Sequence, residues 1–134
     1  MIALDTSVLI DVLVADPRHA DASEAAIASA LAAGEVVVCE AVVAELQSML
    51  DTDANVMEVL ESMGVRFQPG SEQVAIRAGL MYRRFRARGG RRERVIPDFL
   101  IGAHAMRQCT ALITRDEAFF RQFFKGLRII APGP

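Results

Sequence analysis

Four acidic residues, Asp5, Glu45, Asp98 and Asp116, stand at positions where a carboxylate could take part in chemistry. They are separated by 40, 53 and 18 residues, so only the folded chain could bring them together. Carboxylates without accompanying cysteines favour Mg²⁺ or Mn²⁺, which prefer oxygen ligands. Such an ion would lower the pKa of a bound water and stabilise negative charge on a phosphate. Together the four residues indicate hydrolysis of a phosphodiester bond.

Asp5 and Asp116 each follow a short apolar segment and begin a segment of helical character. The apolar segments are residues 2–4 and 111–114, and both are typical of buried strands. In open α/β sheets, ligands bind at the carboxyl ends of the strands. A helix N-terminus also stabilises an ionised carboxylate, which a metal ligand must be. Taken singly, helix capping explains either residue better.

Glu45 falls within a helix predicted for residues 40–50 and borders its apolar stripe. On a helical wheel it lies about 40° from Met49 and about 60° from Val42, which both belong to that stripe. This boundary position allows two interpretations. The carboxylate either joins a partly buried site or reaches water.

Asp98 gives the sharpest signal, because its predicted helix is apolar around most of its circumference. The helix runs from Pro97 to about Gln108, and its polar residues His104, Arg107 and Gln108 share one arc. Asp98 lies outside that arc. An unpaired buried carboxylate costs several kcal/mol or more, so it must neutralise, pair or bind a metal. Capping of the first helical turn is the alternative.

Short apolar strands alternate with helices, and this alternation predicts the scaffold that would position the acids. The strands are mostly apolar rather than alternating, which is typical of a parallel sheet covered on both faces. We expect a single three-layer α/β domain over residues 1–134, with a mainly parallel sheet of four or five strands. The predicted strands are residues 2–4, 36–38, 65–67, 111–114 and 127–130. The predicted helices are about residues 8–14, 20–33, 40–50, 54–63, 71–86, 97–108 and 116–124.

The composition is that of an ordinary globular chain. The 134 residues are 52% hydrophobic and 24% charged, which fits one domain. No stretch approaches the roughly 20 apolar residues of a membrane helix. Asp5 and Asp11 interrupt the apolar first segment, which argues against a signal peptide. Cys39 and Cys109 form no CxxC pair, so we expect reduced, packed thiols in a cytoplasmic protein.

Charge is distributed unevenly, although the net charge is only -2. Residues 1–76 contain 13 acids and two bases, whereas residues 77–134 contain 13 bases and four acids. Phosphates favour clustered cations, so a nucleic-acid surface is one interpretation. A solvated helix face followed by a basic loop is the other. The strongest concentration is the segment 82–94, YRRFRARGGRRER, which we term the basic strip.

The segments that contain the four acids resemble, in order and spacing, the acidic motifs of PIN domains. These segments are LDTSVLID at 4–11, AVVAEL at 41–46, IPDFLIGAHA at 96–105 and LITRDEAFF at 112–120. The likeness covers nearly the whole chain and is nearest to the bacterial VapC-type toxins. It implies a three-layer α/β/α PIN-like domain with a twisted, mainly parallel sheet. It also implies cutting of RNA that depends on Mg²⁺ or Mn²⁺.

The resemblance assigns roles by motif position. The four acids become the catalytic and metal-binding quartet, with Asp5 and Asp98 as the direct ligands. Ser7 matches a small hydroxyl residue of the first motif. Thr114 matches a threonine of the last motif and would orient a carboxylate or a water.

The resemblance also implies partners. They are an RNA substrate, a second copy in a homodimer, and a cognate VapB-type antitoxin whose tail occupies the acidic groove. We expect the basic strip to hold the RNA backbone without selecting a sequence. Its candidate residues are Arg83, Arg84, Arg86, Arg88, Arg91 and Arg92.

Other interpretations fit the residues less well. A domain that binds RNA or a partner without catalysis stays open, although all four acids are present. An α/β hydrolase with an aspartate nucleophile would need a second acid at the position of Ser7. A receiver-like signalling domain would need an acidic pair where the chain has Asp5 and Thr6. The sequence contains no GxxxxGK[ST] or GxGxxG motif, so nucleotide-loop chemistry has no support.

Overall fold

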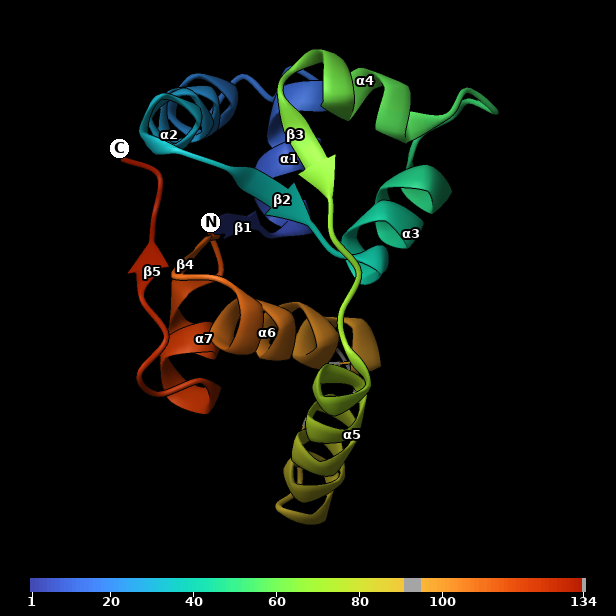
Figure 1. Ribbon diagram of the computed structural model, residues 1–134, viewed down its shortest axis with the longest axis vertical. Helices are drawn as coiled ribbons and strands as arrows, with labels where there is room; N and C mark the ends of the chain where they lie inside the picture. Colours follow the sequence, from blue (N-terminus) through green and yellow to red (C-terminus); the bar gives the residue numbers. More distant parts are fainter. Residues whose placement is uncertain (91–94, 134) are drawn as a thin grey trace.

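The strands form one parallel sheet, shown in Figure 1 as a computed structural model of the chain. The structure describes residues 1–90 and 95–133. Within them, five strands pair in the order β3-β2-β1-β4-β5, each parallel to its neighbours. They are β1 (Ile2–Leu4), β2 (Val36–Val38), β3 (Val65–Phe67), β4 (Ala111–Ile113) and β5 (Ile129–Ile130). The predicted parallel sheet is confirmed, with β5 beginning two residues later than expected.

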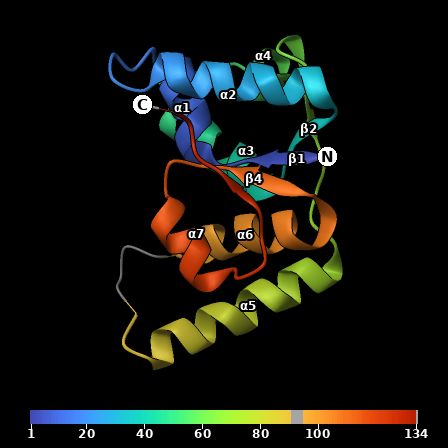
Figure 2. The same cartoon turned by 90° about the vertical axis from the view of Figure 1, so that its left-hand side faces the viewer.

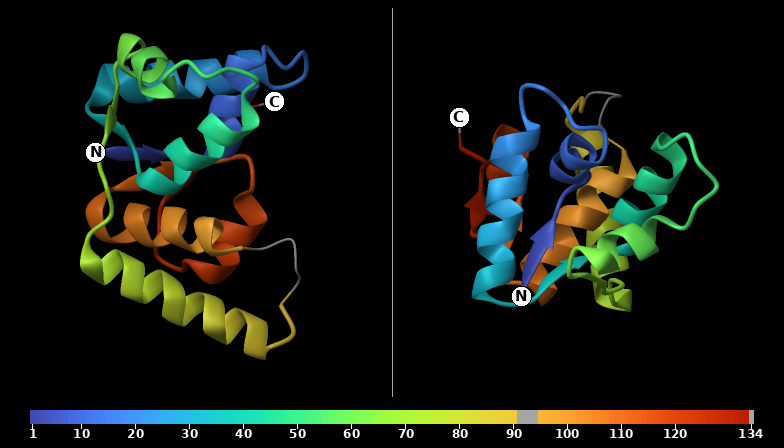
Figure 3. Two further views of the ribbon diagram at one scale, coloured as in Figure 1. Left: turned by 90° about the vertical axis from the view of Figure 1, so that its right-hand side faces the viewer. Right: turned by 90° about the horizontal axis from the view of Figure 1, so that it is seen from above.

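Helices cover both faces of this sheet. They are α1 (Thr6–Leu13), α2 (Ala20–Ala33), α3 (Glu40–Met49), α4 (Val56–Ser62), α5 (Glu72–Ala87), α6 (Ile96–Gln108) and α7 (Glu117–Phe123). Figures 2 and 3 show α2 and α4 on one side of the strands and α5, α6 and α7 on the other. This confirms the expected three-layer α/β/α architecture. No helix in the described part of the chain is long and apolar enough to cross a bilayer.

The direction of strand addition changes between β1 and β4. From β1 the chain moves outward through β2 to β3, then returns to place β4 on the other side of β1 and β5 beyond it. Ligands bind in open α/β sheets at the carboxyl ends of the strands next to such a change. Asp5 directly follows β1, and Asp116 lies three residues after the end of β4. The topology itself therefore brings these two acids to one edge.

Burial of apolar side chains holds the layers together. The side chains of β2 and β4 are buried throughout, as expected for strands covered on both faces. On the α5–α7 side, the Phe99 ring of α6 lies 5.4 Å between centroids from both Phe85 and Phe119. Cys39 and Cys109 are free thiols whose pKa burial raises to about 11. Both thiols are therefore protonated at neutral pH, as expected for packed cysteines.

His104, which the sequence places on the polar arc of α6, is buried. The residue is 1% exposed, and Nε2 lies 3.0 Å from Oε1 of Gln68. Burial lowers the pKa of the imidazole and favours its neutral form. The segment after β3 runs across this part of α6, where Gln108 also donates a hydrogen bond to Gln68. Helix periodicity cannot reveal such a covering segment.

Gly102 allows α6, which carries Asp98, to pack closely on the chain after α7. An added Cβ at Gly102 would lie 2.3 Å from the buried Phe124 ring, whereas one at Gly79 of α5 meets nothing within 4 Å. We expect Gly102→Ala to lower the free energy of unfolding by about 1–3 kcal/mol. Gly79→Ala should raise it by about 0.5–1 kcal/mol. Urea denaturation followed by circular dichroism would measure both, and equal effects would contradict this packing.

Candidate active site

Asp5 lies at the centre of the polar residues gathered at the carboxyl edge of the sheet. The residue is 6% exposed. Oδ2 accepts hydrogen bonds from the hydroxyls of Ser7 at 3.0 Å and Thr114 at 2.6 Å, and Oδ1 accepts one from the Thr6 N–H at 2.8 Å. Burial raises the pKa of Asp5, and these hydrogen bonds reduce the rise without cancelling it. Asp5 therefore caps α1 and is also held in one orientation.

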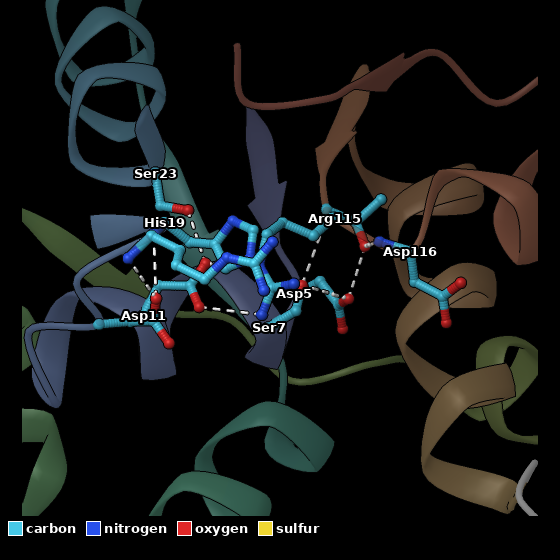
Figure 4. Close-up of polar contacts among 10 residues, drawn as sticks. Asp5, Ser7, Asp11, His19, Ser23, Arg115 and Asp116 are labelled. Carbon is cyan, nitrogen blue, oxygen red and sulfur yellow. Dashed lines mark hydrogen bonds and ion pairs between the residues drawn. The ribbon is translucent and has the colours of Figure 1, made fainter. Parts of the chain in front are cut away.

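Thr114 connects Asp5 to Asp116. Its buried hydroxyl donates to Asp5 and accepts a hydrogen bond from the Asp116 N–H at 2.9 Å. Figure 4 shows Asp5 and Asp116 at the ends of neighbouring strands. Asp116 is the N-cap residue of α7, but its side chain makes no capping hydrogen bond to that helix. Helix capping therefore explains the position of the Asp5 side chain only in part, and it does not explain the position of the Asp116 side chain.

Glu45 brings a third carboxylate to this edge from α3. Its side chain is half-buried, as its boundary position predicts, and Oε1 accepts a hydrogen bond from the Thr6 hydroxyl at 2.7 Å. Burial raises the pKa of Glu45. The Thr6 hydrogen bond opposes this rise, and the nearby charges of Asp98 and Asp5 add to it. Glu45 is therefore close enough to both acids for their charges to act on it.

Asp98 approaches the same carboxylates from the first turn of α6. It is half-buried, and Oδ2 accepts a hydrogen bond from the Val95 N–H at 3.2 Å, so it does cap its helix. Its negative charge also contributes to the raised pKa of Asp5 and of Glu45. The structure thus brings Asp5, Glu45 and Asp98 together from three different elements.

The chemistry of these donors fits a hard divalent cation. Asp5, Glu45 and Asp98 offer carboxylate oxygens, which Mg²⁺ and Mn²⁺ prefer, and a cation would relieve their mutual repulsion. Within residues 1–90 and 95–133, no three acidic, histidine or cysteine side chains stand close enough to hold an ion as they are placed. Binding an ion through several of them would therefore require side-chain rotation.

Comparison with known proteins agrees with this fold. A model of the PIN domain matches residues 2–124. The chain belongs to the PIN-domain family. The family places this PIN domain among nucleases, which hydrolyse nucleic acids. A comparison with curated proteins finds no match.

Several solved structures share the fold of this PIN domain. VapBC2 from Rickettsia felis, bound to a promoter DNA fragment, matches with a TM-score of 0.73 and 19% identity over 98% of both chains. VapBC-1 from nontypeable Haemophilus influenzae matches with a TM-score of 0.71 and 20% identity over 98% of both chains. A toxin–antitoxin complex from Klebsiella pneumoniae matches with a TM-score of 0.64 and 17% identity, over 99% of this chain and 98% of the other. At these identities the likeness establishes the fold.

Two further features support the site of this PIN domain, and neither was predicted from the sequence. Thr6 holds Asp5 through its N–H and Glu45 through its hydroxyl. Asp11, 1% exposed, accepts hydrogen bonds from Arg115 Nε at 2.6 Å and Nη2 at 2.9 Å, and from the Ser23 hydroxyl at 2.8 Å (Figure 4). An acid within an apolar helical run is the signal for such a pair, because a buried carboxylate needs partners.

The Asp11–Arg115 pair fastens the segment between β4 and α7 to α1. Arg115 lies between Thr114 and Asp116, and its N–H also donates to the Ser7 hydroxyl at 3.2 Å. Ser7 and Thr114 each donate a hydrogen bond to Asp5 through their hydroxyls. Their supporting role in catalysis remains a prediction.

The basic strip does not form one surface on α5. Arg83, Arg84, Arg86 and Arg88 are exposed, whereas Arg91 and Arg92 lie outside the described residues. At about 100° per residue, Arg84 and Arg88 share one face of the helix, and Arg83 and Arg86 point elsewhere. The Arg86 guanidinium lies 5.0 Å from the centroid of the Tyr82 ring. A single strand of RNA therefore cannot contact all the described arginines of the strip in the same way.

Proposed function

We propose that residues 1–134 form a single PIN-like domain that acts as a Mg²⁺- or Mn²⁺-dependent endoribonuclease, the toxin of a toxin–antitoxin pair. One observation carries this proposal. Asp5, Glu45 and Asp98 converge from β1, α3 and α6 on the edge where Thr114 joins Asp5 to Asp116. Acids grouped in this way repel one another unless a cation or protons intervene, and a cation there would be placed to act on a phosphate.

The residues take distinct roles in this proposal. Asp5 and Asp98 bind the ion directly, and Glu45 and Asp116 complete the acidic quartet. The bound ion would supply an activated water and offset negative charge on the phosphate. Ser7 and Thr114 keep the Asp5 carboxylate in place by donating to the same oxygen, Oδ2. This leaves the other oxygen, Oδ1, with the Thr6 N–H as its hydrogen-bond donor.

The structural neighbours suggest the biological setting of this activity. One is a toxin–antitoxin complex from Klebsiella pneumoniae, and others are VapBC2 and VapBC-1. By analogy, we infer that this chain has a cognate VapB-type antitoxin. We further propose an RNA substrate and a homodimer in the cytoplasm, as the resemblance of the acidic motifs implies.

Incubation of the purified, antitoxin-free protein with a mixed RNA pool tests the proposal. Discrete cuts that need Mg²⁺ or Mn²⁺ and disappear with EDTA are the expected result. Single-stranded DNA, incubated in parallel, would show whether RNA is preferred. A folded protein that binds RNA but cuts none of a pool containing structured RNAs would instead support the alternative. That alternative is a module that binds RNA or a partner without catalysis.

Mg²⁺ should stabilise the folded protein more at neutral pH than at acidic pH. The pKa values of Asp5 and Glu45 are raised by folding. The stability that these two carboxyl groups contribute is therefore fully present below their unfolded-state pKa. It is lost as the pH rises through their folded-state pKa. An ion that binds the ionised carboxylates offsets this loss, whereas at lower pH it must displace protons. At a concentration 100 times its Kd, the ion would contribute about 2.7 kcal/mol.

Differential scanning calorimetry at pH 5 and pH 7.5, with and without Mg²⁺, measures this effect as a change in Tm. The Asp5→Asn variant is the control, because it removes one proposed ligand. A Mg²⁺-induced rise in Tm that is equal at both pH values, or equal in the variant, would contradict the assignment of Asp5 as a ligand.

A further inference from the structure

A groove leads away from the acidic edge between α5 and α7. It begins beside Asp116 as a pocket of about 340 Å³. A second pocket of about 460 Å³ shares Phe85, Gly90, Gln122 and Phe123 with the first. The two hollows are therefore adjacent, and we term them together the α5–α7 groove. Figure 2 shows both helices on the same side of the sheet.

Cations line the part of this groove that is remote from the acids. Arg77, Arg84 and Arg88 come from α5, and Lys125 follows α7. Spacings of seven and four residues place the three arginines on one face of α5. All four side chains are exposed, and no acid is among the described residues that line this pocket. The charge of the pocket therefore attracts an anion.

Apolar side chains lie between these cations. Met81, Phe85 and the half-buried Phe123 line the same pocket. The rings of Phe85 and Phe123 meet edge to face, with 5.2 Å between their centroids. Cations beside an aromatic surface suit a nucleotide, because its phosphates pair with the cations and its base stacks on the ring.

The end of α5 gives the groove a defined wall. Gly89 adopts a positive φ of 77°, and the Gly90 N–H donates to the Phe85 carbonyl at 2.9 Å. This arrangement closes the helix with a glycine-based cap. A Cβ at Gly90 would lie 2.3 Å from the Phe85 ring, so the backbone packs directly against the ring. The groove is thus shaped by packing within the protein itself.

We propose that the α5–α7 groove binds the single-stranded RNA that extends from the scissile phosphate, with its backbone along Arg84, Arg88 and Lys125. This inference rests on the proposed endoribonuclease function. A strand bound at the acids must leave them across a surface that does not repel it. The groove starts at Asp116 and becomes cationic farther away. That proximity favours the substrate over an acidic protein segment, because cleavage requires a phosphate of the strand to lie at the acids.

Paired variants in an Asp98→Asn background, which is expected to bind RNA without cutting it, test this proposal. The Kd for a short fluorescent single-stranded RNA would be measured over a range of salt concentrations. Arg84→Ala with Arg88→Ala should weaken binding about tenfold at low salt and lower the salt slope by about 1.4, since each phosphate contact contributes about 0.7. Arg83→Ala with Arg86→Ala removes the same charge from another arc of α5 and should change the slope much less.

Two outcomes would overturn the proposal. Equal changes in slope for the two pairs would mean that RNA responds only to total charge. Unchanged RNA binding after loss of Arg84 and Arg88 would mean that RNA does not bind in the groove. An acidic protein segment would then be the better candidate for its ligand. The titration detects binding rather than cutting. A slope that depends on Arg84 and Arg88, together with no RNA cleavage by the wild-type protein, would therefore support RNA binding in the groove and refute the endoribonuclease function.

Discussion

Asp98→Asn is expected to reduce the rate of RNA cleavage by about 10³-fold or more without unfolding the protein. Loss of the proposed direct metal ligand would remove transition-state stabilisation, and about 4 kcal/mol corresponds to about 10³-fold in rate. Asparagine retains a side-chain oxygen that can accept the Val95 N–H, so the cap of α6 is kept. It also removes a charge that raises the pKa of Asp5 and Glu45. Stability at neutral pH should therefore be equal or higher.

Glu58→Gln is the matched control for this substitution. Glu58 is the third residue of α4, as Asp98 is of α6, and its side chain is exposed. Both variants lose one negative charge in the first turn of a helix, but only Asp98 lies among the carboxylates. Single-turnover cleavage and Tm would be measured for both. Cleavage by Asp98→Asn at the wild-type rate would place the active site elsewhere or reveal a contaminating nuclease.

Arg115→Met is expected to cost about 3–5 kcal/mol of unfolding free energy, because it leaves the Asp11 carboxylate buried without its cation. The Asp11 side chain is 2% exposed, so water cannot replace the guanidinium. The Ser23 hydroxyl still donates to the carboxylate but carries no charge. Release of the segment that holds Thr114 and Asp116 should also lower cleavage in whatever fraction remains folded. Chemical denaturation would measure the stability change.

Two variants separate this effect from ordinary loss of charge. Arg121→Met breaks an exposed pair with Glu117, whose side chains are 55% and 47% exposed, and should cost at most about 1 kcal/mol. Asp11→Asn, added to Arg115→Met, removes the buried charge and should restore part of the lost stability. Equal losses for Arg115→Met and Arg121→Met, or no recovery in the double variant, would mean that the buried pair contributes little.

The strands and helices could be predicted because their signals are local. Residues 36–38 are an apolar, β-branched run before a helix start, and residues 65–67 have Val65 and Phe67 around Arg66 between Gly64 and Pro69. They became β2 and β3 at the predicted positions. Ser71 and Gly89 mark the ends of α5 in the same way. The parallel sheet followed from strands such as residues 36–38 and 111–113, which are apolar on both faces. Because each signal depends on neighbouring residues, no knowledge of the tertiary fold was needed.

The sequence by itself also placed Asp5 and Asp116 at strand ends, and the four acids in PIN-like motifs. Only the tertiary structure decided how they are held. The Thr6 hydroxyl reaches Glu45 across 39 residues, and Arg115 reaches Asp11 across 104. The same applies to His104, buried under the segment after β3, and to the groove between α5 and α7. Periodicity tells which side of a helix is apolar, but which element covers that side depends on packing of the whole chain.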